Sequence, residues 1–443
     1  MLRFGTDGVR GVANVDLTPE LVLAFGRAAA RVLGADRFVV GRDTRRSGSL
    51  LEGALVAGLA AEGADVSRLG VAPTPAVAWL AATEGVAGAV ISASHNPFED
   101  NGVKLFTPAG AKLTDEVEAV LEAELGRLLE APAAASVRGA GVGSVRDAHA
   151  DIERWQRSVT DSVEPGALAG LHVVIDCANG AVYEVAPIVL RQLGATVTVL
   201  HDAPDGTNIN AGCGSTHPGD LQAAVVGQGA DLGLAFDGDA DRVLAVDETG
   251  RLIDGDQIIA VTAIDLRARG LLAHDTVVVT VMTNLGFHLG MAEQGITVLE
   301  VPVGDRYVLE ALANRDLSLG GEQSGHVVFG DMATTGDGLL TGVQLLDAVR
   351  RAGKPLGALA DAAMTRLPQV LHNVRVASRG LDVAAAIAGD VEEVEAELGD
   401  HGRVLIRPSG TEPLVRVMVE APTEEAAEAA ATRLVAAVEG LGS

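Results

Sequence analysis

Aromatic residues are scarce in this chain of 443 residues. Phe, Trp and Tyr together make up 3%, whereas proteins that bind single-stranded nucleic acid stack the bases on aromatic side chains. A net charge of −27 would also repel a phosphorylated polymer at long range. We therefore expect no nucleic-acid partner, and a small anionic substrate would need basic residues close to it.

Cysteine, lysine and long apolar runs are also rare. Cys177 and Cys213 are the two cysteines, too few for a disulfide framework, and we expect both to be packing residues in a reducing compartment. The chain shows no charged-then-apolar leader and no apolar run long enough to span a bilayer, so we expect a cytoplasmic protein without a membrane partner. The three lysines are Lys104, Lys112 and Lys354.

One pattern, an apolar strand followed by a loop, an amphipathic helix and a second strand, occurs three times. The repeats begin with the strands RFVVGR at residue 37, HVVID at residue 172 and TVVVT at residue 276. A strand–helix–strand unit favours parallel pairing through a right-handed crossover. One large sheet would have the same periodicity, but the repetition favours three similar mixed α/β domains.

The last part of the chain has a different pattern. The β-rich runs RVLIR and LVRVMVEA flank a turn, and a helix follows with Thr423 as its N-cap. This pattern predicts a smaller C-terminal α+β domain. Changes in composition place the four domains at residues 1–148, 149–250, 251–366 and 367–443.

The stretch ISASHNPFEDNGVKLF, from Ile91 to Phe106, contains two serines, a histidine and Lys104 between apolar flanks. Ser, Asn, Pro, Asp and Gly are typical of turns, so the composition alone favours a simple loop. The alternative is a loop that presents a nucleophile, and the other motifs of the chain favour this second interpretation.

The sequence FDGDADRVLAVDE places Asp237, Asp239 and Asp241 on alternate residues after an apolar strand. Three carboxylates on one loop form an all-oxygen ligand set, which predicts Mg²⁺ or a similar ion rather than zinc. An EF-hand is excluded because Arg242 stands where that loop needs glycine and VLAV continues as a strand. A solvated acidic turn is the remaining alternative.

Two further loops carry polar side chains. In GGEQSGH, Glu322, Ser324 and His326 fall on alternate positions, and they could face sugar hydroxyls or an amine from one side of the loop. A polar loop with a satisfied histidine would have the same composition. We expect Asp337 in TTGDGLL to begin a helix or a turn.

The turn RPSGTEP combines Arg407 with small residues, namely Ser409, Gly410 and Thr411. Backbone N–H groups and hydroxyls in such a turn can bind an anion beside an arginine, although many hairpins share the composition. Of the other arginines, Arg10 in RFGTDGVRG is the favoured phosphate ligand. The arginines of GRDTRRSG could complement a phosphate as well, but arginines are common at protein surfaces, so we favour a surface position for Arg42, Arg45 and Arg46.

These motifs resemble those of the α-D-phosphohexomutase superfamily over essentially the whole chain. The matching segments are FGTDGVRG, GRDTRRSG, SASHNP, VVIDCANGA, NINAGCGSTHP, DGDADR, GGEQSGH and RPSGTEP. One departure is Ala240, where the family often has glycine. This change leaves the three aspartates in place and puts only the flexibility of the loop in doubt.

The resemblance implies a heart-shaped enzyme in which three α/β domains and a C-terminal domain surround a central cleft. It also implies a set of site residues. Ser94 would be phosphorylated and would hold Mg²⁺ together with Asp237, Asp239 and Asp241; Glu322 and Ser324 would bind the sugar; Arg407, Ser409, Gly410 and Thr411 would bind phosphate; and Arg10, Lys104 and His326 would transfer protons or stabilise phosphate. His95 could orient the phosphate or brace the loop.

The resemblance to the amino-sugar branch of this superfamily implies an isomerase for a small phosphosugar. It would interconvert glucosamine 6-phosphate and glucosamine 1-phosphate through a phosphoserine and a 1,6-bisphosphate, with a hexose 1,6-bisphosphate as activator. The alternatives are a mutase for glucose or mannose phosphates, a serine phosphatase and a silent sugar-phosphate sensor. The oligomeric state stays open, with a homodimer as one alternative.

Overall fold

The structure is a computed structural model, and it describes residues 8–130, 137–376, 383–408 and 414–441. The chain forms two compact units, each made of two segments. The first unit consists of Met1–Val281 and Ile296–Asp361, and the second consists of Met282–Gly295 and Ala362–Ser443. Among the helices of the described segments, none is both long and apolar enough to cross a membrane.

The first sheet of the larger unit has six strands. Their order across the sheet is β1 (Val9–Val12), β5 (Asp100–Phe106), β4 (Ala87–Ile91), β2 (Arg37–Arg42), β3 (Asp65–Val71) and β6 (Val145–Asp147). The central strand β2 is parallel to β3 and β4, whereas β5 runs antiparallel to β4 and β1. The sheet is therefore mixed.

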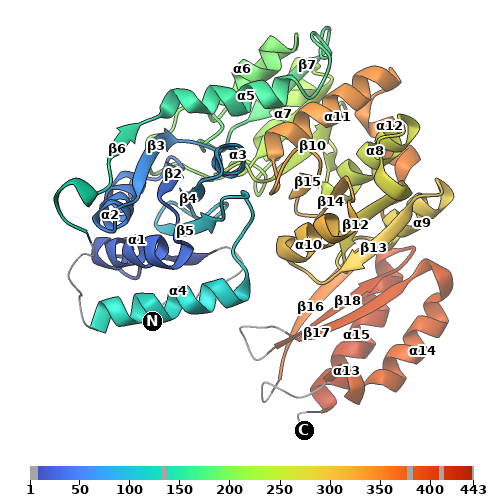
Figure 1. The fold of residues 1–443 in the computed structure, drawn as a ribbon. Helices are drawn as coiled ribbons and strands as arrows, with labels where there is room; N and C mark the ends of the chain where they lie inside the picture. Colours follow the sequence, from blue (N-terminus) through green and yellow to red (C-terminus); the bar gives the residue numbers. More distant parts are fainter. Residues whose placement is uncertain (1–7, 131–136, 377–382, 409–413, 442–443) are drawn as a thin grey trace. The chain divides into compact units, whose positions relative to one another are not determined.

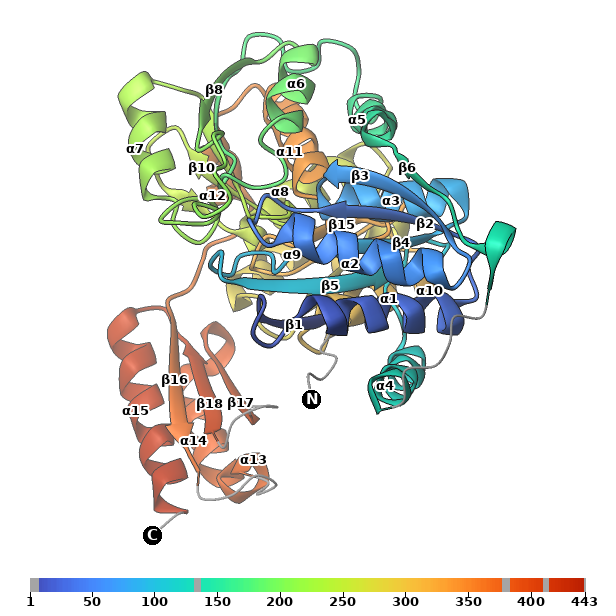
Figure 2. The same cartoon turned by 90° about the vertical axis from the view of Figure 1, so that its left-hand side faces the viewer.

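Helices cover both faces of this sheet (Figure 2). The helices of this part are α1 (Pro19–Leu33), α2 (Gly48–Ala61), α3 (Thr74–Glu84), α4 (Asp115–Glu130) and α5 (Ile152–Thr160). Buried apolar residues of α1, α2 and α4 form one core with the strands. The α1 helix begins where the hydroxyl of Thr18 accepts a hydrogen bond from the Leu21 N–H.

The second sheet has five strands. Their order is β11 (Leu252–Ile253), β10 (Val243–Asp247), β9 (Leu232–Phe236), β7 (His172–Asp176) and β8 (Thr196–Leu200). The β7 strand is parallel to β8 and β9, and β10 is antiparallel to β9. The helices α6 (Val185–Gln192) and α7 (Gly219–Gln228) belong to this part, and α7 packs Leu221 and Val225 against the sheet. Both cysteines lie in loops near this sheet and are buried, unpaired thiols, as the composition predicts.

The third sheet has four strands, in the order β13 (Thr297–Val301), β12 (Thr276–Thr280), β14 (Leu319–Gly321) and β15 (Val327–Phe329). Its first three strands are parallel, and β15 is antiparallel to β14. The surrounding helices are α8 (Gly255–Ala268), α10 (Asp305–Arg315), α11 (Gly338–Ala352) and α12 (Leu356–Ala363). The α8 helix contacts both β10 and β14, so it joins the second and third sheets within the unit.

The smaller unit contains an antiparallel sheet in the order β16 (Gln369–Arg375), β18 (Leu414–Glu420) and β17 (Arg403–Pro408). Its helices are α9 (Leu285–Glu293), α13 (Val383–Ala386), α14 (Ala388–Leu398) and α15 (Glu424–Gly440). Thr423 caps α15 through its hydroxyl, as the sequence predicts. The α9 helix lies in this unit because buried Glu420 accepts a hydrogen bond from the Leu285 N–H.

The observed architecture confirms the predicted fold class of three mixed α/β parts and a smaller C-terminal α+β part (Figure 1). Each predicted strand–helix–strand repeat forms two parallel strands, as in β2 and β3, β7 and β8, and β12 and β13. The loops that carry the polar motifs follow the carboxyl ends of β4, β9 and β14. In open α/β sheets this is the edge at which ligands bind.

Candidate active site

Ser94 lies three residues beyond the end of β4 in a buried loop. Its φ angle is 52°, in the left-handed region that costs a residue other than glycine about 1 kcal/mol. This conformation turns the hydroxyl toward the loop after β9, where Ser94 Oγ donates a hydrogen bond of 2.6 Å to Asp237 Oδ2. The nucleophile candidate and the acidic loop therefore meet at one point.

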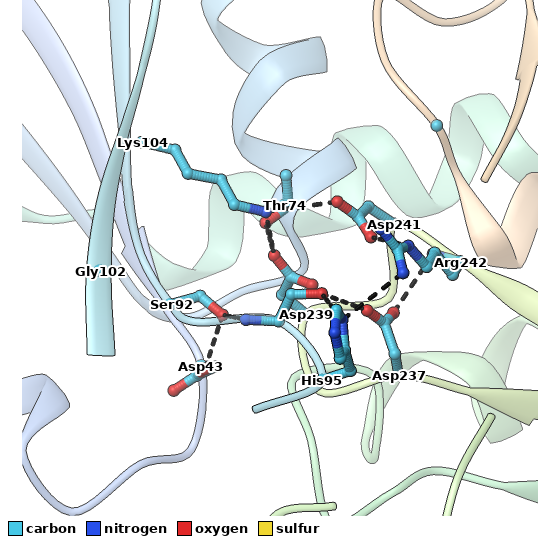
Figure 3. Close-up of polar contacts among 12 residues, drawn as sticks. Asp43, Thr74, Ser92, His95, Gly102, Lys104, Asp237, Asp239, Asp241 and Arg242 are labelled. Atoms are coloured by element: carbon cyan, nitrogen blue, oxygen red, sulfur yellow. Dashed lines mark hydrogen bonds and ion pairs between the residues drawn. The ribbon is translucent and has the colours of Figure 1, made fainter. Parts of the chain in front are cut away.

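The neighbouring serine is held differently. Ser92 Oγ donates to Asp43 Oδ2 at 2.6 Å and accepts from the Ser94 N–H at 2.9 Å. The Ser92 side chain is fully buried, and its hydroxyl turns to Asp43 (Figure 3). The Ser94 hydroxyl instead faces the carboxylate of Asp237. This difference agrees with the prediction that Ser94, rather than Ser92, carries a phosphoryl group.

The three aspartates of the β9 loop are buried and close together. One carboxylate oxygen from each of Asp237, Asp239 and Asp241 lies within 4.8 Å of the other two. In the described part of the chain, Asp239 Oδ1 and Asp241 Oδ1 have no hydrogen-bond partner. Buried carboxylate oxygens without donors are costly, and a cluster of three carboxylates suits a hard divalent cation such as Mg²⁺. The residues present therefore fit the predicted metal.

The loop geometry depends on two small residues. Ala240 has a φ angle of 58°, a conformation in which glycine would be unstrained, so the departure from the family pattern falls on a left-handed position. At Gly238, a Cβ atom would lie 2.5 Å from the backbone oxygen of Ser94. Only glycine lets the acidic loop approach the Ser94 loop this closely.

Burial and the neighbouring charges shift the pKa values of two aspartates of this cluster in opposite directions. Burial and the charges of Asp241 and Asp239 raise the pKa of Asp237 well above its usual value. Burial also acts to raise the pKa of Asp241, but Lys104 and His326 outweigh it and hold that pKa well below its usual range. Lys104 Nζ lies 2.8 Å from Asp239 Oδ2 and 3.3 Å from Asp241 Oδ2. Lys104 thus pairs with two of the three carboxylates, and Arg242 Nε lies 3.9 Å from Asp241 Oδ1.

Lys104 reaches this cluster from β5, the antiparallel neighbour of β4. Arg10 lies on the adjacent β1, opposite Gly102 in the register. His95 Nδ1 lies 3.3 Å from Ser94 Oγ and 3.5 Å from a guanidinium nitrogen of Arg242. Burial and the charges of Arg242 and Arg10 lower the pKa of His95, so its imidazole is neutral beside Ser94.

The loop between β14 and β15 carries the predicted sugar-binding residues. Glu322 Oε1 accepts a hydrogen bond from the Gly304 N–H at 3.2 Å, and Ser324 Oγ lies 3.4 Å from Glu322 Oε2. Ser324 is exposed, whereas His326 is buried. Glu322, Ser324 and His326 therefore do not face one side of the loop as expected, because Gly325 turns the chain with a φ angle of 88°.

His326 packs instead against two acids. Its Nδ1 lies 3.8 Å from Asp241 Oδ2, its Nε2 lies 3.3 Å from Asp305 Oδ2, and Nε2 also accepts from the Gly336 N–H at 3.1 Å. Burial lowers the pKa of His326, but Asp241 and Asp305 outweigh it and raise that pKa above its usual value. The histidine thus links the sugar loop to the metal loop.

The predicted phosphate loop lies in the smaller unit. Arg407 is on β17, paired in register with Arg416 of β18, and it is partly exposed. Ser409, Gly410 and Thr411 lie outside the described residues. The role of this loop stays a prediction.

Sequence reasoning missed three residues that hold the loops together. Thr74 donates from its hydroxyl to Asp239 Oδ2 at 2.7 Å and from its N–H to the Asp239 carbonyl at 2.9 Å. Asn210 donates to the Ser94 carbonyl at 2.9 Å. Arg45 was expected at the surface, and this expectation is wrong because its side chain is fully buried beside Asp43.

Family models match successive parts of the chain. The models describe phosphoglucomutase/phosphomannomutase alpha/beta/alpha domains I, II and III and the C-terminal domain, and they match residues 1–131, 153–250, 254–367 and 371–437, respectively.

Curated proteins match at high identity. A phosphoglucosamine mutase of Frankia alni is 56% identical over 449 residues, which cover 98% of this chain and 97% of the relative. A phosphoglucosamine mutase of Desulforudis audaxviator is 54% identical over 427 residues, which cover 95% of this chain and 94% of the relative.

Solved structures share the fold. A phosphoglucomutase/phosphomannomutase family protein of Burkholderia thailandensis has a TM-score of 0.81 at 26% identity, covering 98% of this chain and 97% of that one. The N-acetylphosphoglucosamine mutase of Aspergillus fumigatus, solved with GlcNAc-6P and magnesium, has a TM-score of 0.72 at 19% identity, covering 100% of this chain and 96% of that one. The second likeness shows the fold alone.

Proposed function

Because this chain belongs to the phosphoglucomutase/phosphomannomutase family, we propose that it is a phosphoglucosamine mutase. It interconverts glucosamine 6-phosphate and glucosamine 1-phosphate in the cytoplasm, and its product feeds the synthesis of UDP-N-acetylglucosamine for peptidoglycan. Relatives at 53–56% identity over nearly the whole chain support the amino-sugar substrate. The two buried, unpaired thiols suit a reducing compartment.

Ser94 carries the transferred group in this proposal. The phosphoryl group leaves phospho-Ser94 Oγ and bonds to O1 of glucosamine 6-phosphate. The O1 hydroxyl proton passes to a base, and Ser94 Oγ takes up a proton. The resulting 1,6-bisphosphate turns over in the site, and its 6-phosphoryl group returns to Ser94 Oγ, which loses that proton while O6 takes one up and becomes a hydroxyl. Glucosamine 1-phosphate leaves and the phosphoserine is restored, so a trace of a hexose 1,6-bisphosphate suffices to activate the enzyme.

The other residues position charge around this transfer. Asp237, Asp239 and Asp241 would hold Mg²⁺ together with the Ser94 phosphate, and the bound ion would neutralise the charge of the phosphoryl group. Lys104 faces the same carboxylates, so it would stabilise a phosphate on Ser94. Glu322 and Ser324 would orient the sugar hydroxyls.

The remaining predicted residues complete the proposal. Arg10 and His326 would stabilise phosphate or transfer the proton, and the ring of His326 lies between two buried acids, Asp241 and Asp305. Arg407, Ser409, Gly410 and Thr411 would bind the phosphate that is not being transferred. The four functional parts are proposed at residues 1–148, 149–250, 251–366 and 367–443.

One observation carries the proposal: the buried Ser94 hydroxyl lies 2.6 Å from a carboxylate of a three-aspartate cluster. The test is phosphorus NMR of the purified protein with Mg²⁺ and glucosamine 6-phosphate, primed with a trace of a hexose 1,6-bisphosphate. We expect an anomeric phosphate signal that grows to a constant ratio with the 6-phosphate, and no such signal from a Ser94→Ala variant.

Other outcomes would point to other activities. Release of inorganic phosphate would indicate a phosphatase in which water attacks the phosphoserine. Turnover of glucose or mannose phosphates in preference to glucosamine phosphate would indicate a different mutase of the same family. Full turnover by Ser94→Ala would refute the phosphoserine mechanism.

A further inference from the structure

A buried arginine holds the loop that contains Ser94. Arg45 lies after β2, and its guanidinium group is fully buried in contact with the equally buried Asp43. Its Nε donates to Asp43 Oδ2 at 2.8 Å. The other four N–H groups donate to backbone carbonyls of Ser94 at 2.9 Å, Asn96 at 2.8 Å, Asp100 at 3.0 Å and Pro97.

This set of bonds uses all five N–H groups of the guanidinium. None remains for a phosphate or a sugar, so Arg45 does not bind the substrate. Four carbonyls of one short loop point at one planar group, and a planar fork of donors can fix them in a way that the single nitrogen of lysine cannot. Arg45 therefore defines the path of the backbone from Ser94 to Asp100.

A residue of the second α/β part, Asn210, also bonds to two of these carbonyls. Asn210 Nδ2 donates to the Ser94 carbonyl at 2.9 Å and to the Asn96 carbonyl at 3.0 Å. These two carbonyls are therefore bonded by both Arg45 and Asn210. The double attachment holds Ser94 at its φ angle of 52°, the conformation that turns the hydroxyl toward Asp237.

We propose that Arg45 is a positioning residue for phosphoryl transfer, which sets the place and direction of Ser94 Oγ without touching the substrate. The inference rests on the proposed mutase function. Arg42, in the same motif, does not have this role, because its described hydrogen bonds go to Glu52 and to the Asp43 carbonyl and not to the Ser94 loop.

The positioning role has a specific kinetic consequence. Without Arg45, the loop keeps its residues but loses the four bonds that fix its backbone, so Ser94 Oγ shifts from its place beside Asp237. A displacement of about 1 Å can cost about 100-fold in rate. Because Arg45 makes no substrate contact, the loss should fall on kcat and leave KM for glucosamine 6-phosphate near the wild-type value.

The experiment compares wild-type protein with Arg45→Lys and Arg45→Ala. The lysine variant keeps the buried charge and most of the volume, so it tests the positioning role even if the alanine variant does not fold. Each protein is measured for mutase kcat and KM, for thermal unfolding and for the share of phosphate on Ser94 and Ser92 by mass spectrometry. Activity of Arg45→Ala is also measured with added guanidinium at a concentration that does not unfold the wild type.

The matched control is Arg31→Ala. Arg31 also bonds two acids, Glu62 at 2.7 Å and Glu124 at 2.9 Å, and its removal changes the charge equally. Within the described part of the chain its hydrogen bonds go to these two acids and not to the Ser94 loop. We expect kcat of this variant to match the wild type even if its thermal stability falls.

The inference holds if kcat of Arg45→Lys drops about 100-fold with a nearly unchanged KM, and if guanidinium restores part of the activity of Arg45→Ala. It is overturned if either Arg45 variant turns over at the wild-type rate, or if activity falls only in proportion to the folded fraction and guanidinium has no effect. A wild-type protein without mutase activity would refute the proposed function, and the inference with it.

Discussion

Asp337 offers a test of the electrostatics beside the active site. It begins α11, where its Oδ1 accepts a hydrogen bond from the Leu340 N–H at 2.9 Å, and its Oδ2 accepts from the indole N–H of Trp155 at 3.0 Å. Burial raises its pKa to about 6. The perturbation is Asp337→Asn, which removes the charge and keeps the shape of the side chain.

The size of the effect follows from linkage. The pKa of Asp337 rises from 3.8 to about 6 on folding, so the folded state binds the proton more tightly. Stability is therefore greatest below the unfolded pKa and declines as the pH rises through the folded pKa, by about 3 kcal/mol in total at about 1.4 kcal/mol per unit. Between about pH 4.5 and about pH 7.5 the decline is about 2 kcal/mol.

The asparagine variant lacks this decline because it cannot ionise. It also loses the acceptor for the Trp155 indole, which should cost about 1–3 kcal/mol at every pH. We therefore expect Asp337→Asn to be less stable than the wild type in acid, and the gap to narrow by about 2 kcal/mol toward neutral pH.

The assay is urea unfolding at a series of pH values, followed by Trp155 fluorescence in a Trp79→Phe background. Trp155 is buried in contact with Asp337, so its emission reports this region. Asp161→Asn, at an exposed position after α5, should follow the wild-type pH profile. A constant stability gap between wild type and Asp337→Asn across the range would refute the reasoning.

Three further predictions concern the loops. Asp239→Asn removes a buried carboxylate of the metal cluster, so the Mg²⁺ concentration for half-maximal activity should rise at least about tenfold. Changes to residues that only surround a metal's ligands already lower metal affinity by about that factor. An unchanged value in a Mg²⁺ titration would contradict the metal role. Glu322→Gln should lower kcat/KM for glucosamine 6-phosphate about 10- to 100-fold, because a hydrogen bond to a charged acceptor contributes about 1.5–3 kcal/mol, and wild-type kinetics would exclude a sugar contact. Gly238→Ala would place a Cβ atom 2.5 Å from the Ser94 carbonyl and should reduce turnover about 100-fold, whereas Gly227→Ala, which meets nothing within 4 Å, should leave turnover unchanged.

Local patterns predicted most of the fold. The strand–helix–strand repeats were visible because apolar periodicity reflects which face of each element is buried. The three aspartates could be predicted as a cluster because they lie within five residues of one another. Lys104 was singled out because it lies ten residues from Ser94, and the antiparallel pairing of β4 and β5 brings it to the same site.

Partners distant in the sequence could not be predicted in this way. Thr74 bonds Asp239, which is 165 residues away, and Asn210 bonds Ser94 across 116 residues. Such pairs depend on how two sheets pack, which periodicity does not encode. Arg45 was misjudged for a related reason, because an arginine is usually exposed unless a ring of acceptors surrounds it, and its acceptors are carbonyls of a loop some 50 residues further on.

The bonds between the first two sheets have a consequence for chimeric proteins. Thr74, at the start of α3, donates to Asp239 of the aspartate loop, and Asn210, in the segment between β8 and α7, donates to the carbonyl of Ser94. Each part of the chain therefore supplies a residue that holds a catalytic loop of the other, so the two halves of the chemistry depend on a matched pair of surfaces. A recombinant that exchanged residues 1–148 alone with a relative would inherit one surface without the other. Exchange through the end of β10, by contrast, would keep the pair together, and crossover points in directed evolution should be chosen there.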